Sequence, residues 1–180
     1  RCYSQMPQVK LVGVHDALMQ AAEDTARQYG TVAVASLEQL ADRVRAVTIA
    51  VPTEHHLSAA EPFLKRGIAC LIEKPLARDE REGGRIVELA RAGGAVVQVG
   101  HIERFNPAIR ALEKMDLRPR FIEVARISPM TFRSIDVGVV LDMMIHDLDI
   151  VLKLAGSAVT KLDAAGVSVI GGVEDICNAR

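Results

Sequence analysis

Four ionisable side chains recur at helical spacing within residues 139–154. Asp142, His146, Asp149 and Lys153 are three or four residues apart, which places them on one face of an α-helix. The rest of the stretch is almost entirely apolar, as in a buried helix. Because an unpaired buried charge is costly, we expect this polar line to face a cavity, a ligand or a paired charge. A surface helix with a solvated polar stripe is the alternative.

His146 has the chemistry of a proton acceptor. A hydride leaves the carbon of a secondary alcohol only if the hydroxyl proton also leaves, and histidine is suited to accept that proton. Asp142, one turn earlier, would orient the imidazole or contact a substrate directly. Metal binding by Asp142, His146 and Asp149 is a competing interpretation, although no second cluster supplies the remaining ligands.

Apolar runs alternate with helical segments over the first hundred residues. The apolar runs are continuous, which is typical of parallel strands covered by helices on both faces. We therefore predict an α/β fold with a doubly wound parallel sheet. The predicted strands cover residues 9–14, 31–35, 46–51, 68–72 and 95–100. The predicted helices cover residues 17–29, 36–42, 54–66 and 79–92.

The pattern changes after Gly100. The later segments are a helix at 106–115, an extended stretch at 119–127, a helix at 139–154 and a strand at 161–170. This order indicates the beginning of a second, mixed α/β domain. We therefore predict one domain over residues 1–104 and the start of another over residues 105–180.

Polar side chains follow four of the predicted strands. Open parallel sheets bind their ligands outside the carboxyl ends of the strands, so these residues are candidates for a site. They are Asp16, Pro52 with Thr53, Glu73 with Lys74 and Pro75, and Gly100 with His101.

Asp16 follows the first predicted strand of the chain. An acidic residue after a strand of a nucleotide-binding sheet accepts hydrogen bonds from the adenosine ribose hydroxyls. An adjacent arginine would favour a 2′-phosphate, whereas Ala17 and Leu18 follow here, which favours NAD over NADP. A helix N-cap is a second role that Asp16 could fill at the same time.

Two further strand ends carry candidates. Thr53 lies where a strand gives way to a helix, whose free N–H groups attract polar cofactor edges. His56, one turn later, would line the same edge or be an ordinary surface histidine. Lys74 stands between an apolar strand and Pro75, which restricts its backbone. There it would donate to a substrate hydroxyl, unless Glu73 and Lys74 are simply a solvated surface pair.

The composition limits the classes of partner. The 180 residues are 49% hydrophobic and 25% charged with a net charge of −1, without the basic excess of a nucleic-acid-binding protein. No run approaches the ~20 apolar residues of a membrane span. Cys2, Cys70 and Cys177 lack metal-binding spacing and fit a reduced, cytoplasmic compartment. We expect a small-molecule ligand, with no nucleic acid, membrane or metal.

Three motifs together resemble the Gfo/Idh/MocA oxidoreductases. They are E-K-P at 73–75, G-H-I-E-R-F-N-P at 100–107, and the D-x-x-x-H of Asp142 and His146. The resemblance implies a Rossmann domain that binds NAD, then an α/β substrate domain whose open sheet mediates homo-oligomers. In this family the lysine of the first motif and the aspartate and histidine of the last are catalytic. It therefore implies catalytic roles for Lys74, Asp142 and His146.

The resemblance also implies a substrate class. Q-V-G-H-I-E-R-F-N-P, V-V-L-D-M-M-I-H-D-L-D and D-I-C-N-A-R are similar to members that oxidise the 3-hydroxyl of a nucleotide sugar with NAD, in the lipid A pathway. Other members act on other sugars or on inositol. A catalytically silent regulator that binds dinucleotide or sugar, and a non-enzymatic scaffold, are alternatives of a different class.

The full set of predicted site residues is larger than the catalytic three. The predicted cofactor contacts are Asp16, Pro52, Thr53, His56, Glu73, Lys74 and Gln98. The implied substrate contacts are Arg104, Asn106 and Arg133, each equally plausible as a structural or exposed residue. The family pattern begins with a strand and a G-x-G-x-x-G turn for the pyrophosphate, which this sequence lacks. We therefore expect a fragment that binds NAD poorly and has little activity.

Overall fold

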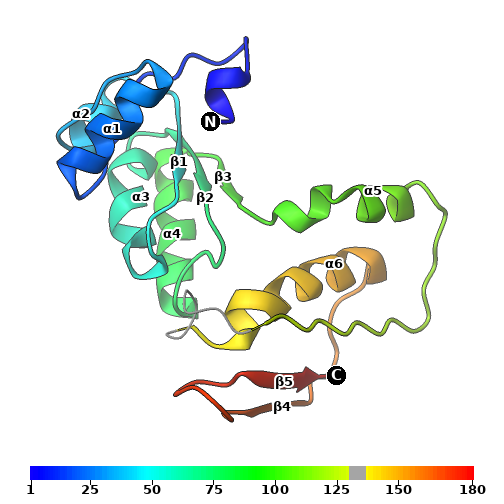
Figure 1. Cartoon of the computed structure of the whole chain (residues 1–180). Coiled ribbons are helices and arrows are strands. Elements are labelled where there is room, and N and C mark those ends of the chain that lie inside the picture. The colour runs from blue at the N-terminus through cyan, green and yellow to red at the C-terminus, as the bar shows by residue number, and fades with distance from the viewer. Residues whose placement is uncertain (130–136) are drawn as a thin grey trace. The chain divides into compact units, whose positions relative to one another are not determined.

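The computed structural model describes residues 1–129 and 137–180 (Figure 1). They form two compact units, Arg1–Gly100 and His101–Arg180. The division falls directly after the last strand of the first unit, whereas the sequence pattern suggested a boundary after residue 104.

A three-stranded parallel sheet organises the first unit. Its strands, in spatial order, are β1 (Ala46–Ile49), β2 (Ala69–Ile72) and β3 (Val97–Val99). The register places Val47 beside Cys70 and Cys70 beside Val97, so side chains from all three strands line one face together. The predicted parallel sheet is confirmed for these three strands.

Local signals in the sequence define the helices of this unit. They are α1 (Met19–Tyr29), α2 (Leu37–Ala41), α3 (His56–Leu64) and α4 (Glu80–Gly93), with 3₁₀ turns at Tyr3–Gln5 and Thr53–His55. Ser36 Oγ accepts a hydrogen bond from Gln39 N–H at 3.2 Å to cap α2, and Asp79 Oδ1 accepts one from Glu82 N–H at 2.8 Å to cap α4. The four predicted helices are therefore confirmed, although α1 begins at Met19 rather than at residue 17.

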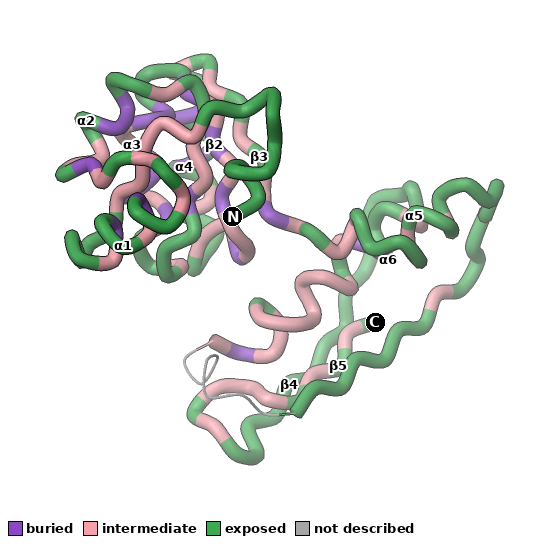
Figure 2. Tube along the Cα trace, turned by 45° about the horizontal axis from the view of Figure 1, so that its top comes forward, coloured by how far each residue is buried: buried purple, intermediate pink, exposed green. Residues whose placement is uncertain are grey.

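The core of the first unit lies on one face of the sheet. Phe63 and Leu64 of α3, Ile86 of α4 and Ile72 of β2 have no exposed surface, and buried residues gather around these elements in Figure 2. The opposite face carries Thr48, Leu71 and Gln98 in register, and Gln98 is exposed.

The prediction of two full strands at residues 9–14 and 31–35 is wrong. The two segments share a single parallel bridge between Val14 and Ala33. Val14 N–H donates to Val32 O at 2.9 Å, and Val34 N–H donates to Val14 O at 2.8 Å. Apolar character predicted strands here, but a strand also needs a neighbour along its length, which these segments lack among the described residues.

Among its described residues, the second unit has two α-helices and a small antiparallel sheet. Its elements are a 3₁₀ turn (Ile102–Phe105), α5 (Pro107–Glu113), a π-helical turn (Val140–Met144), α6 (Ile145–Ala155), β4 (Ala164–Val167) and β5 (Ile176–Ala179). Both predicted helices are confirmed, but the longer one begins with a π-helical turn that the sequence pattern did not predict. The predicted strand at 161–170 is confirmed in shortened form, and β5 is an additional strand.

The helices of the described residues are short. The longest, α4, has 14 residues, whereas a membrane span needs about 20. No helix within 1–129 or 137–180 has both the length and the apolar character needed to cross a membrane.

Candidate active site

The ends of β1, β2 and β3 bring loop residues to one edge of the parallel sheet. Glu73 N–H donates to Ile49 O at 2.9 Å, and Gly100 N–H donates to Ile72 O at 2.7 Å. A Cβ added to Gly100 would lie 2.9 Å from Glu73 Oε2. Glycine at this position therefore allows the Glu73 carboxyl group to lie against the end of β3.

Lys74 is half-buried at this edge. It lies between half-buried Glu73 and buried Pro75, and its N–H donates to Glu73 Oε2 at 3.3 Å. The Lys74–Pro75 peptide bond is cis. The alternative of a fully solvated Glu-Lys pair is wrong, because neither side chain is exposed. The catalytic role of Lys74 stays a prediction.

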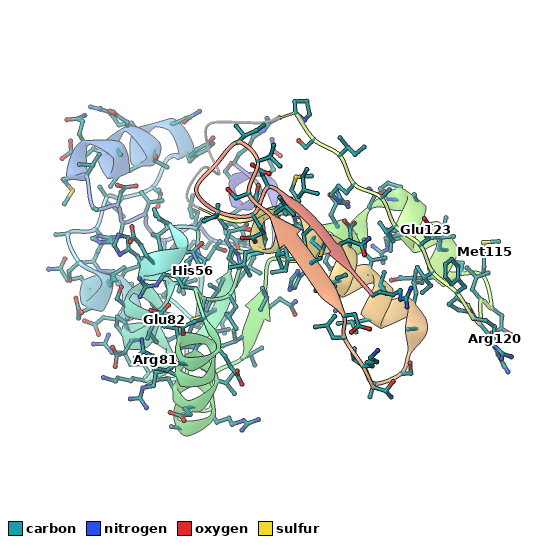
Figure 3. All side chains as sticks on the ribbon, turned by 90° about the horizontal axis from the view of Figure 1, so that it is seen from below. His56, Arg81, Glu82, Met115, Arg120 and Glu123 are labelled. Atoms are coloured by element: carbon teal, nitrogen blue, oxygen red, sulfur yellow. The ribbon has the colours of Figure 1, made fainter. Side chains whose placement is uncertain are left out.

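His56 lies inside the first unit (Figure 3) and is only 1% exposed. Its Nδ1 is 3.0 Å from Pro75 O and 3.3 Å from Leu76 O, and its Nε2 is 2.9 Å from Val51 O. The ring therefore ties the residue after β1 to the loop after β2. The surface-histidine alternative is wrong. Since both ring nitrogens already face carbonyl groups, any part that His56 has in cofactor binding acts through the loops it holds.

Pro52 and Thr53 lie between β1 and α3. Pro52 is exposed, and its carbonyl accepts a hydrogen bond from His55 N–H at 2.8 Å. Half-buried Thr53 begins the 3₁₀ turn that leads into α3. This is the strand-to-helix transition that the sequence predicted, and contact between these residues and a cofactor stays a prediction.

Asp16 and Gln98 are exposed side chains of the first unit. Asp16 Oδ1 accepts a hydrogen bond from Leu18 N–H at 2.9 Å and so caps the turn before α1. Gln98 lies within β3 rather than after it, and its Nε2 donates to Val99 O at 3.1 Å. The N-cap residue of α1 is Leu18, so the predicted N-cap role of Asp16 is wrong, and cofactor contacts by both residues stay predictions.

In the second unit, Asp142 lies in the π-helical turn and His146 in the first turn of α6. Asp142 N–H donates to Gly138 O at 3.0 Å. Asp142 and His146 are both half-buried. π-helical turns in proteins are frequent at functional sites. Lys74 belongs to the first unit, so the three predicted catalytic residues are divided between the two units.

The remaining members of the polar line form ion pairs. Asp149 accepts hydrogen bonds from Arg104 Nε at 2.6 Å and Nη2 at 2.5 Å, and Lys153 pairs with Glu113. The hydrogen bonds from Arg104 are the main reason why the pKa of Asp149 lies below its usual value. The polar line thus faces paired charges over its second half.

Two of the three predicted substrate residues already have structural partners. Arg104 holds Asp149 as described above. Asn106 Oδ1 accepts a hydrogen bond from Ala108 N–H at 3.0 Å and caps α5, while its Nδ2 donates to Glu103 Oε2 at 3.2 Å. These contacts supply the structural role left open for both residues. Arg133 lies outside the described residues.

Glu174 supports the candidate site and was missed by sequence analysis. Its backbone carbonyl accepts a hydrogen bond from Val139 N–H at 2.8 Å, and its Oε1 accepts one from Val140 N–H at 3.4 Å. A Cβ added to Gly138 would lie only 1.9 Å from this carboxylate. Glu174 therefore caps the segment that carries Asp142, through a contact between residues far apart in the sequence, for which no local signal exists.

Metal ligation has no geometric support in residues 1–129 and 137–180. Nowhere in these ranges do three or more His, Cys, Asp or Glu side chains come together around a common point. The Asp149 carboxylate, a member of the competing metal set, is held by Arg104. Burial raises the pKa of the Cys70 thiol to about 11, which keeps this group protonated and unreactive.

The chain is similar to known oxidoreductases along most of its length. Residues 1–101 match the Gfo/Idh/MocA family model, described as an oxidoreductase family with an NAD-binding Rossmann fold. UDP-N-acetylglucosamine 3-dehydrogenase of Acidithiobacillus ferrooxidans is 36% identical over 171 residues, which are 94% of this chain and 55% of that protein. The scyllo-inositol 2-dehydrogenase (NAD(+)) of Bacillus subtilis is 30% identical over 91% of this chain and 51% of its own.

The three-dimensional comparison agrees with these matches. A solved structure of the Acidithiobacillus UDP-N-acetylglucosamine 3-dehydrogenase superposes with a TM-score of 0.91 at 35% identity, covering 98% of this chain and 58% of that one. The chain therefore spans about half the length of the curated relatives it matches.

Proposed function

Because the chain belongs to the Gfo/Idh/MocA family of oxidoreductases, we propose that the protein is an NAD-dependent dehydrogenase that oxidises a secondary hydroxyl of a sugar. The 3-hydroxyl of UDP-N-acetylglucosamine is the proposed position of oxidation, as part of 3-amino sugar synthesis for lipid A. The support for this substrate is the similarity to a relative of that name over 94% of the chain.

The observation that carries the proposal is the half-buried Lys74 at the carboxyl edge of a parallel sheet. Ligands of such sheets bind at this edge. The buried His56 ring contacts Pro75 O in the loop after β2. Glu73, next to Lys74 in the chain, packs on Gly100. An amine in this position would donate to the substrate oxygen, where it would stabilise negative charge as the hydroxyl proton leaves.

His146 is the proposed acceptor of the hydroxyl proton. Oxidation of an alcohol moves a hydride from carbon and a proton from oxygen, and imidazole accepts a proton near neutral pH. Asp142, four residues earlier on the same helical segment, would orient the imidazole or bind a neighbouring substrate hydroxyl. In this proposal the first unit binds the cofactor and the second unit binds the substrate.

The residues of the first unit fit a dinucleotide. Asp16 offers an exposed carboxylate for ribose hydroxyls, and Thr53 begins a helical segment whose N–H groups suit polar cofactor edges. Neither Ala17 nor Leu18 carries the cation that a 2′-phosphate would need, which favours NAD. NAD, when bound, supplies the acceptor for the hydride.

A second candidate is oxidation of inositol. The specific support is the 30% identity to scyllo-inositol 2-dehydrogenase over 91% of this chain.

We also propose that the whole protein is a homo-oligomer that uses the sheet of β4 and β5, because every residue of β4 is exposed. Light scattering of the purified protein would measure its mass.

The test of the proposed reaction is absorbance of reduced nicotinamide. The whole protein is mixed with NAD and either UDP-N-acetylglucosamine or myo-inositol, and a transaminase with glutamate removes the ketone product of the sugar nucleotide. We expect a rise with UDP-N-acetylglucosamine that His146→Ala lowers at least a hundredfold, with NAD affinity nearly unchanged. His55→Ala, at a largely exposed histidine, is the matched control.

Other results would change the assignment. A rise with myo-inositol alone would select the second candidate. Full turnover in His146→Ala would remove His146 as the proton acceptor. Ligand binding without any turnover would favour a silent regulator.

A further inference from the structure

A second bidentate ion pair holds α6, next to the proposed proton acceptor. Arg126 donates to Asp147 from Nε, at 3.0 Å to Oδ1 and 2.9 Å to Oδ2, and from Nη2, at 2.7 Å to Oδ1. The Asp147 side chain is only 13% exposed, so this arginine supplies the partner that a largely buried carboxylate needs. Asp147 directly follows His146 in the chain, although it lies off the polar line of α6.

The two ion pairs lie on opposite sides of α6. Each residue of an α-helix advances by about 100°, so Asp147 and Asp149 are about 200° apart around the helix axis. On the same scale, His146 is about 100° from Asp147 and about 60° from Asp149 on the other side. The position of His146 therefore falls within the arc of about 160° that the two pairs enclose.

The partners of the two aspartates come from different segments of the second unit. Arg104 belongs to the 3₁₀ turn of Ile102–Phe105, and Arg126 belongs to residues 121–129, which form neither helix nor strand. They are 45 and 21 positions away from the aspartates that they bind. One pair alone would leave the helix free to pivot about that contact, whereas two pairs on opposite sides prevent its rotation about its own axis.

We propose that Arg126 and Asp147 are positioning residues, which keep His146 in the orientation for proton transfer by preventing rotation of α6. This inference rests on the proposed function and extends it. The planar guanidinium group binds a carboxylate in one geometry, so the pair fixes a direction as well as a distance. A rotation that displaced the imidazole by about 1 Å would cost on the order of a hundredfold in rate. Replacing a buried ion pair by apolar residues is often neutral for stability, so effects on the reaction and on the fold can be separated.

The test compares Arg126→Met, Arg126→Lys and Arg118→Met with wild type in the whole protein. Methionine removes the guanidinium group, whereas lysine keeps the charge without the two-pronged contact. We expect Arg126→Met to lower kcat by about ten- to hundredfold, while KM for the sugar and Kd for NAD change by less than about twofold. Arg126→Lys should recover part of kcat. Arg118→Met is the matched control, because the Arg118 side chain is 88% exposed and lies 3.9 Å from Asp116.

A double variant separates positioning from a general structural role. In the His146→Ala background the proton acceptor is absent, so Arg126→Met should lower the remaining turnover by less than about twofold. A loss by the same factor in both backgrounds would overturn the inference, as would wild-type kcat in folded Arg126→Met. Thermal unfolding shows whether each variant is folded. If Arg126→Met does not fold, the variant that also carries Asp147→Leu leaves no unpaired charge and is judged by the same two criteria.

The two proposals fail in different ways. Wild-type turnover that His146→Ala lowers but Arg126→Met leaves intact would refute the positioning role alone. A wild-type protein that oxidises neither UDP-N-acetylglucosamine nor myo-inositol would refute the proposed function and this inference with it.

Discussion

Replacing His56 by leucine would test whether this ring holds the two loops at the carboxyl edge of the sheet. The ring is 1% exposed and faces the carbonyl groups of Val51, Pro75 and Leu76 at 2.9 to 3.3 Å. In His56→Leu these carbonyls lose the ring nitrogens that face them, while the contact at Pro75 O stays buried. A buried polar group without a partner costs about 1–3 kcal/mol.

We therefore expect His56→Leu to lower the free energy of unfolding of the first unit by about 2–4 kcal/mol. Urea denaturation followed by circular dichroism would measure the change. The loops released by the substitution carry Thr53 and Lys74, so the affinity for NAD should fall even though the ring does not face the solvent. His56→Gln should lose less stability, because its amide can still donate to one carbonyl.

His55→Leu is the matched control for His56. The His55 side chain is 60% exposed and lies 3.7 Å from Glu54, so its loss should change stability by less than about 0.5 kcal/mol. Equal effects of the two substitutions would refute the reasoning. So would normal stability combined with an unchanged NAD affinity in His56→Leu.

Two further predictions concern α4 and the ion pair of the second unit. Gly93→Ala should destabilise the first unit by about 2–4 kcal/mol, because the added Cβ would lie 1.9 Å from Leu64 O. Gly84→Ala, with no atom within 4 Å of its Cβ, should stabilise the first unit by about 0.5–1 kcal/mol. Urea denaturation checks both variants, whose midpoints should shift in opposite directions from that of wild type. Because Arg104 lowers the pKa of Asp149, the pair stabilises the fold above the ordinary pKa of about 4, and this contribution is lost as pH falls through the lowered value. The difference in thermal midpoint between wild type and Asp149→Asn should accordingly be complete at pH 6 and shrink below about pH 4, whereas a constant difference would contradict this assignment.

Signals within a few residues of one another predicted much of the fold. Ser36, Asp79 and Asn106 each precede a helix and cap it as their residue types suggest. The continuous apolar runs predicted the parallel pairing of β1, β2 and β3. Such signals succeed because a cap or a buried strand is determined largely by its own sequence.

Contacts between distant residues account for what the sequence did not predict. His56 is buried because the carbonyl groups of Val51, Pro75 and Leu76 converge on it, and nothing near residue 56 encodes that. Arg104 pairs with Asp149, 45 positions later, and no local signal indicates that partner. Substrate contact by Arg104 stays a prediction. The run at residues 9–14 has strand-like composition, but pairing requires neighbours that composition does not specify.

The π-helical turn at Val140–Met144 changes how Asp142 and His146 are aligned. In a regular α-helix each residue advances by about 100°, so four residues overshoot a full turn by about 40°. A π-helical turn is wider and advances less per residue, so it removes part of this overshoot. By this winding alone, the Cα positions of Asp142 and His146 lie closer to one line along the helix axis than in a regular α-helix. Deleting Met143 would shorten the turn and leave three residues instead of four from Asp142 to His146, an advance of about 300° in α-helical winding.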